Sequence, residues 1–169
     1  MTKVNKSELL LTLLQKSVEK CYMNDLPLIE RSMEQSCVAR IFYYMQKTLE
    51  EDKHFVSLSS CNLDSEYNKN YAQIKKTLRR PKGTRPDIVL HKRCANDSNM
   101  LVVEFKSRRG RNKIDPFTGQ NIDFIKLEDF TDPGIYHYFL GVHVKLQKQG
   151  ARYTYFQNGE ETPREKLRE

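Results

Sequence analysis

The chain has 169 residues, of which 38% are hydrophobic and 30% are charged, and its formal net charge at pH 7 is +7. This length and composition predict a single domain over residues 1–169 with its own hydrophobic core. The longest uncharged apolar run, residues 9–14, is too short to cross a bilayer, and the amino terminus has no signal-peptide cleavage pattern. We therefore expect a cytoplasmic protein with no membrane partner. The four cysteines form no CxxC pair and have no histidine at zinc-finger spacing, so we expect free thiols and no zinc.

The first half of the chain predicts helices. Apolar residues at helical spacing predict a helix over 6–22, which is an amino-terminal extension capped by Asn5 or Ser7, and a second helix over about 27–49. Alternating residues at 55–61 predict a strand. Residues 62–70 fit either a strand end or a loop, and residues 72–79 fit a short helix.

The second half predicts strands around one helix. Strands are expected at 87–91 and 100–106, joined by the turn 96–99, and a basic loop follows at 108–119. A helix over 121–131 precedes strands near 136–146 and 151–157, and a frayed charged tail is expected at 158–169. This order predicts an α/β fold whose central mixed β-sheet has about five strands and is flanked by helices.

Positive charge is concentrated in the middle of the chain. Between Lys69 and Lys113 there are 14 Lys or Arg residues and three acids, which gives +11, so the rest of the chain sums to −4. A basic segment of this kind favours a polyanionic partner, most simply nucleic-acid phosphate. A solvated lysine-rich surface has the same composition and stays open as an alternative.

Three charged residues interrupt two strands that should otherwise be buried. Side chains alternate along a strand, so Asp87 shares a face with Val89, and Glu104 shares a face with Lys106. If the two strands pair as a hairpin, Asp87 lies near the end that carries Glu104 and Lys106. Carboxylate oxygens suit Mg²⁺ or Mn²⁺, and a cation with an adjacent lysine can assist attack on a phosphodiester.

These residues form the motif RPD at 85–87, followed after sixteen residues by EFK at 104–106. The motif resembles the signature of the PD-(D/E)XK nuclease superfamily. Three more segments are similar, in the same order, to those of its small uncharacterised members of bacterial or phage type. They are EQSCVARIFYYMQ (34–46), DSEYNKN (64–70) and IDFIKLEDF (122–130).

The resemblance implies a restriction-endonuclease-like core and a metal-dependent nuclease. Asp87 and Glu104 would be ligands of Mg²⁺ or Mn²⁺, with the backbone carbonyl of Phe105 as a third. Lys106 would be the catalytic lysine. Glu34 would reach the site from its helix to hold a water molecule or a second ion.

Three further residues are open accessory candidates. Glu30 lies one turn before Glu34 and competes with it for the same role, although the EQS segment favours Glu34. Glu66 would lie near the metal or steer the loop before Asp87, and Lys126 would face phosphate. A solvated surface position explains each of the three as well.

The basic residues that flank the motif would bind phosphate groups with little sequence preference. They are Arg79, Arg80, Lys82, Arg85, Arg108, Arg109, Arg111 and Lys113. The predicted activity is hydrolysis of nucleic acid, with DNA favoured over RNA and internal cleavage favoured over attack from ends, and a homodimer is compatible with it. The alternative is a non-catalytic nucleic-acid-binding or interaction protein that keeps the nuclease fold.

Overall fold

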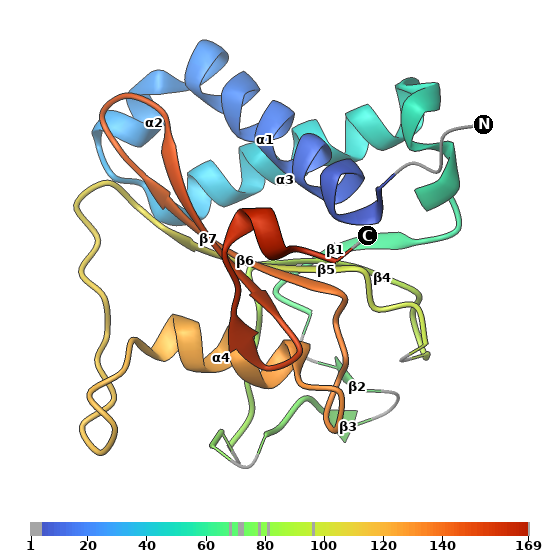
Figure 1. Cartoon of the computed structure of the whole chain (residues 1–169). Coiled ribbons are helices and arrows are strands. Elements are labelled where there is room, and N and C mark those ends of the chain that lie inside the picture. The colour runs from blue at the N-terminus through green and yellow to red at the C-terminus, as the bar shows by residue number, and fades with distance from the viewer. Residues whose placement is uncertain are drawn as a thin grey trace.

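A mixed six-stranded β-sheet lies at the centre of the computed structural model, and helices cover both of its faces (Figure 1). The structure describes residues 5–67, 69–70, 73–77, 79–80, 82–95 and 97–168. The helices are α1 (Lys6–Asn24), α2 (Leu26–Glu30), α3 (Glu34–Glu51) and α4 (Ile122–Thr131), with 3₁₀ turns η1 (Lys53–Leu58) and η2 (Arg164–Lys166). The strands are β1 (Asn62–Ser65), β2 (Lys69–Asn70), β3 (Gln73–Ile74), β4 (Ile88–His91), β5 (Leu101–Lys106), β6 (Leu140–Leu146), β7 (Ala151–Gln157) and β8 (Glu160–Glu161).

The order of strands in the main sheet is β1-β4-β5-β6-β7-β8, and β2 and β3 form a separate pair. The expected α/β class and mixed sheet are confirmed. The sheet has six strands where about five were expected, because β1 takes the place of the strand expected at 55–61 and part of the tail pairs with β7 as β8. Within the part of the chain that the structure describes, no helix combines the length and apolar character needed to cross a membrane.

The two faces of the sheet belong to different helices, as Figure 1 shows. Ile88 and Val103 are buried with residues of α1 and α3. Val89 and Val102 are buried on the other face, with Leu127 and other residues of α4. The predicted alternation along β4 and β5 is therefore correct, and it places Asp87 and Glu104 on the face that α4 covers.

The register of β4 and β5 positions these two acids. The strands are antiparallel and pair Ile88 with Val103, so the next position in the same register sets Asp87 opposite Glu104. Beyond α4 the chain returns as β6, which pairs in parallel with β5 along the whole length of β5. β5 is thus a central strand, and its carboxyl end extends past the start of β4.

Two predictions in the first half were wrong. Residues 55–61 do not form a strand, because η1 buries Phe55 and Leu58 at the three-residue spacing of a 3₁₀ turn. The predicted helix over 27–49 is two helices, since Ser32 takes a positive φ of 59° and breaks the chain between α2 and α3. Of the two caps predicted for the first helix, Asn5 and Ser7, Asn5 is the one that caps α1.

Three other boundaries also differ from the prediction. Residues 73–77 are not helical, since Gln73–Ile74 is strand β3 and Thr77 forms a bridge with Arg80; residues 72 and 78 lie outside the described part. β6 begins at Leu140 and not near 136, because His137 has a positive φ of 52°. The tail is not frayed: the Arg168 amide donates to Gln157, and its carbonyl accepts from Ser7.

Candidate active site

Asp87 and Glu104 meet at the open end of the β4–β5 pair. The Phe105 amide donates a hydrogen bond of 2.7 Å to Asp87 Oδ2. The N–H and carbonyl of one residue in a strand point to the same side, so the Phe105 carbonyl faces the same edge as Asp87. Glu104 is 2% exposed, and its Oε1 has no hydrogen-bond partner among the described residues.

Two lysines lie between these carboxylates and those of neighbouring elements. Lys126 Nζ, from α4, is 2.9 Å from Glu104 Oε2 and 3.6 Å from Asp123 Oδ1. Lys106 Nζ is 3.1 Å from Asp123 Oδ2 and 3.8 Å from Glu34 Oε1. Acids and lysines therefore alternate in an unbroken chain from Glu34 through Lys106, Asp123 and Lys126 to Glu104.

Glu34 reaches this chain from the first turn of α3. Its Oε2 accepts a hydrogen bond of 2.6 Å from the Ser107 amide, just beyond the end of β5. A Cβ at Gly110 would lie 3.2 Å from Glu34 Oε2 and 2.9 Å from Lys106 Cδ, so the chain after β5 runs tightly against the site. Glu30, the competing candidate, is exposed at the end of α2 and lines neither cavity of the site.

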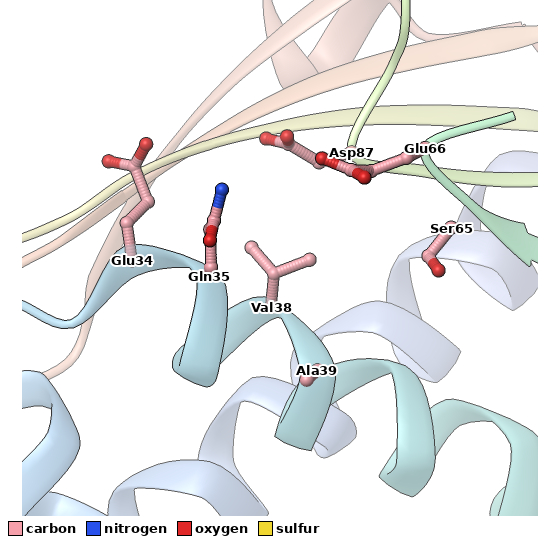
Figure 2. Close-up of a pocket in the computed structure, with 7 residues that line it drawn as sticks. All are labelled: Glu34, Gln35, Val38, Ala39, Ser65, Glu66 and Asp87. Carbon is pink, nitrogen blue, oxygen red and sulfur yellow. The ribbon is translucent and has the colours of Figure 1, made fainter. Parts of the chain in front are cut away.

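Two cavities meet at Glu34 and Asp87. The first, of about 310 Å³, is lined by the chain of acids and lysines together with Arg80, Phe105, Lys113 and Ile122. The second, of about 290 Å³, is lined by Glu34, Gln35, Val38, Ala39, Ser65, Glu66 and Asp87. Figure 2 shows Glu34, Gln35 and Val38 rising from α3 toward the strand end that carries Asp87, with Glu66 beside Asp87.

The pKa values of the acids reflect their burial. Burial raises the pKa of Asp87 to about 6, although the Phe105 amide and Lys126 act in the opposite direction. Burial and then the charge of Asp87 raise the pKa of Glu104 well above its ordinary value, and Lys126 offsets only part of this effect. The site therefore resists carrying both negative charges unless a cation neutralises them.

The lysines respond in the opposite sense. Burial lowers the pKa of Lys106, but the carboxylates of Asp123 and Glu34 outweigh it and hold that pKa above its ordinary value. Burial likewise lowers the pKa of Lys126, and Glu104 and Asp123 outweigh it. Both side chains are therefore ammonium ions at neutral pH.

The donor set fits a hard divalent cation. Among the described residues, no group of three or more His, Cys, Asp or Glu side chains forms an ion-binding cluster. Mg²⁺ is commonly held by only one or two carboxylates, with water and substrate phosphate completing its shell. Asp87, the unpartnered Glu104 Oε1 and the Phe105 carbonyl supply oxygen donors of that kind.

The eight predicted nucleic-acid contacts lie in three settings. Arg79 is held by α4, where it forms ion pairs with Glu128 at 3.0 Å and with Asp129. Arg80 lines the first cavity, and its Nη2 is buried with no hydrogen-bond partner among the described residues. The other six are exposed or half-buried, and one of them, Lys113, lines the first cavity: Lys82, Arg85, Arg108, Arg109, Arg111 and Lys113.

Asp123 is the site residue that the sequence did not reveal. It lies in the first turn of α4, where Asn121 caps its amide, and it bridges Lys106 and Lys126. The available signal was its spacing from Lys126, since residues three apart share one helix face. Glu66, which the sequence did identify, lines only the second cavity.

Neither a protein-family model nor a curated protein matches the sequence.

Proposed function

We propose that this protein is a divalent-metal-dependent nuclease of the PD-(D/E)XK type. The observation that carries the proposal is the convergence of Asp87, Glu104, Lys106 and Glu34 on one cavity from three separate elements. The order α3-β1-β4-β5-α4-β6, with β6 parallel to β5, supports the restriction-endonuclease-like core that the motif implies. Arg80 and Lys113 in the cavity, together with the basic loop that follows β5, support nucleic acid as the substrate, with DNA favoured over RNA.

The cation, Mg²⁺ or Mn²⁺, would be held by Asp87, Glu104 and the Phe105 carbonyl. When bound, it would act as a Lewis acid on the phosphodiester. It would also neutralise the two carboxylates whose pKa values burial raises.

The remaining residues have distinct parts in the proposed hydrolysis. Lys106, an ammonium ion that faces the cavity, would stabilise the negative charge that develops on the phosphate. Glu34 is fixed by the Ser107 amide and borders both cavities, so it would accept a hydrogen bond from the attacking water and orient it. Arg80 and Lys113, on the same wall, would hold substrate phosphates.

One observation favours the second candidate, a non-catalytic nucleic-acid-binding protein. Lys126 already pairs with Glu104 at 2.9 Å, and this ion pair neutralises the buried acid without any metal. In such a protein the basic surface would bind nucleic acid, and the buried charges would only hold α4 against the sheet. Cleavage that depends on a divalent cation separates the two candidates.

The test measures cleavage of labelled duplex DNA, single-stranded DNA and RNA in Mn²⁺ and in EDTA. Asp87→Ala, Glu104→Ala and Glu34→Ala should each abolish or strongly reduce the metal-dependent cleavage. Glu30→Ala is the matched control, because it removes an exposed carboxylate one turn away and should cleave at the parental rate. Salt-sensitive binding without cleavage on every substrate would favour the second candidate.

A further inference from the structure

The basic loop, residues 107–121, connects β5 with α4, and residues at and next to its two ends line the first cavity. Lys106, Lys113 and Ile122 all line that cavity. Lys145 Nζ donates to the carbonyls of Ser107 and Gly110, at 2.9 and 2.6 Å, and anchors the start of the loop to β6. From there the loop extends away from the sheet beside α4 (Figure 1).

The far half of the loop is a hairpin whose two arms are joined by backbone hydrogen bonds. The Ile122 amide donates to the Lys113 carbonyl at 2.8 Å, and the Asp115 amide donates to the Gln120 carbonyl at 2.8 Å. At the tip, Asp115 Oδ1 accepts from the amides of Phe117 and Thr118, at 3.0 and 2.9 Å. These hydrogen bonds restrain the backbone of the tip.

That tip presents an aromatic ring to solvent. Phe117 is 96% exposed, which is the highest value among the exposed large hydrophobic side chains of the described residues. The loop that carries it has four cationic residues, Arg108, Arg109, Arg111 and Lys113, and one acid, Asp115. An exposed ring on a strongly basic support suits a partner that has both flat apolar faces and negative charge, and nucleic acid has both.

The chain length limits how far the ring lies from the cavity. Three residues separate Lys113, on the cavity wall, from Phe117, so the two positions are four residue steps apart. At roughly 3.3–3.6 Å per extended residue, the Cα of Phe117 is at most about 14 Å from the Cα of Lys113. This backbone span corresponds to a few base steps of roughly 3.4 Å each.

We propose that Phe117 is a wedge that stacks on nucleobases a few steps from the phosphate held at the cavity. The position of that phosphate rests on the proposed function. Stacking a side chain between bases requires that they separate, which is least unfavourable where they are already unpaired. The preferred ligand is therefore DNA with unstacked bases, such as a bubble or a junction of single and double strand, over a perfect duplex.

The test measures binding in EDTA, so that no strand is cut, to a perfect duplex and to the same duplex with a short bubble. Both carry 2-aminopurine, whose fluorescence reports unstacking. Phe117→Ala should weaken binding to the bubble by roughly 5- to 150-fold, the range for loss of one base–aromatic stack, and should leave perfect-duplex binding nearly unchanged. Phe117→Trp should retain the preference.

Two further variants separate stacking from general damage. Val56→Ala removes another exposed apolar side chain, on η1, and should behave as the parent. Asp115→Ala breaks the bonds that hold the tip and should reduce the bubble preference. Asp115→Asn keeps an oxygen acceptor for the same amides and should preserve most of the preference.

Three results would overturn the wedge. The first is that Phe117→Ala binds the bubble as tightly as the parent, and the second is that it loses equal affinity for the bubble and the perfect duplex. The third is that the parent self-associates in sedimentation and Phe117→Ala does not, which would make the ring a contact between copies of the chain. Failure of the nuclease proposal looks different. If the parent does not cleave in Mn²⁺ but Phe117→Ala still weakens binding to the bubble, the nuclease proposal fails and the wedge proposal stands. If the parent cleaves but Phe117→Ala binds both DNAs as the parent does, only the wedge proposal fails.

Discussion

Replacing Asp87 with Asn should stabilise the metal-free protein at neutral pH while it abolishes cleavage. Burial raises the pKa of this carboxyl from 3.8 to about 6. Between these values the folded state binds the proton more tightly than the unfolded state, so the free energy of unfolding falls as the pH rises through this window. At about 1.4 kcal/mol per pH unit, the ionised carboxylate costs the fold about 3 kcal/mol above pH 6.

Asparagine removes this cost and keeps the local geometry. It is neutral at every pH, and its side-chain oxygen can accept the hydrogen bond that the Phe105 amide gives to Asp87. In EDTA, Asp87→Asn should therefore be up to about 3 kcal/mol more stable than the parent at pH 7.5 and nearly equal to it at pH 4. Urea denaturation at pH 4, 5, 6 and 7.5 measures both values.

A matched variant on the neighbouring strand should behave in the opposite way. Burial raises the pKa of Asp64, but Arg93 and His91 outweigh it and hold the pKa below its ordinary value. The ionised form of Asp64 thus stabilises the fold at neutral pH, and this contribution is lost as the pH falls through the folded pKa. Asp64→Asn should destabilise the protein at pH 7.5, and the difference from the parent should shrink toward acid pH.

Added Mn²⁺ completes the test of Asp87. An ion that binds only the folded state stabilises it, by about 2.7 kcal/mol at a hundredfold excess over its Kd. The parent should gain this stability and Asp87→Asn should not. If Asp87→Asn is less stable than the parent in EDTA at pH 7.5, or if its stability varies with pH as the parent's does, the electrostatic reasoning about the site is wrong.

Two other variants test the charges around the site. Lys106→Met should reduce the rate of single-turnover cleavage in saturating Mn²⁺ by about 10²- to 10⁴-fold without weakening the affinity for Mn²⁺ in calorimetry. Lys106→Arg should restore little of that rate, because a guanidinium is broader than an ammonium group. Cleavage by Lys106→Met at the parental rate would show that Lys106 has no part in the chemistry. Replacing Arg108, Arg109 and Arg111 together with Ala should weaken binding by a similar factor on every DNA sequence and flatten the slope of log K against log salt by about 0.7–0.9 per lost phosphate contact. An unchanged affinity and slope would mean that these side chains are only solvated.

The parts of the site that follow from local periodicity could be predicted from the sequence. The alternation in 87–91 and 100–106 assigns each side chain to a face, and a short turn between two strands favours antiparallel pairing. Those two rules bring Asp87 near the strand end that carries Glu104 and Lys106, and the register that sets Asp87 opposite Glu104 is known only from the structure. Lys106 follows, because it lies two residues beyond Glu104 on the same strand face.

The parts that depend on contacts between distant segments could not be predicted. In the continuous helix that was predicted, Glu30 and Glu34 would share a face. In the structure the break at Ser32 separates them, and the Ser32 Oγ accepts a hydrogen bond from the Arg109 amide. Asp123 gained its place because α4 packs across β5. The strand predicted at 55–61 failed for a related reason, since apolar residues three apart fit a 3₁₀ turn once Asp52 caps it.

The cavity carries four acids and four bases, and most of them are already paired with one another. Glu34, Lys106, Asp123, Lys126 and Glu104 form the chain of ion pairs that holds α4 and α3 against β5. Arg80 and Lys113 line the same cavity but lie outside this chain of ion pairs. A buried structural network would need only the internal pairs, so these two additional cationic side chains are the feature that favours a phosphate-binding site over a cluster that serves the fold alone.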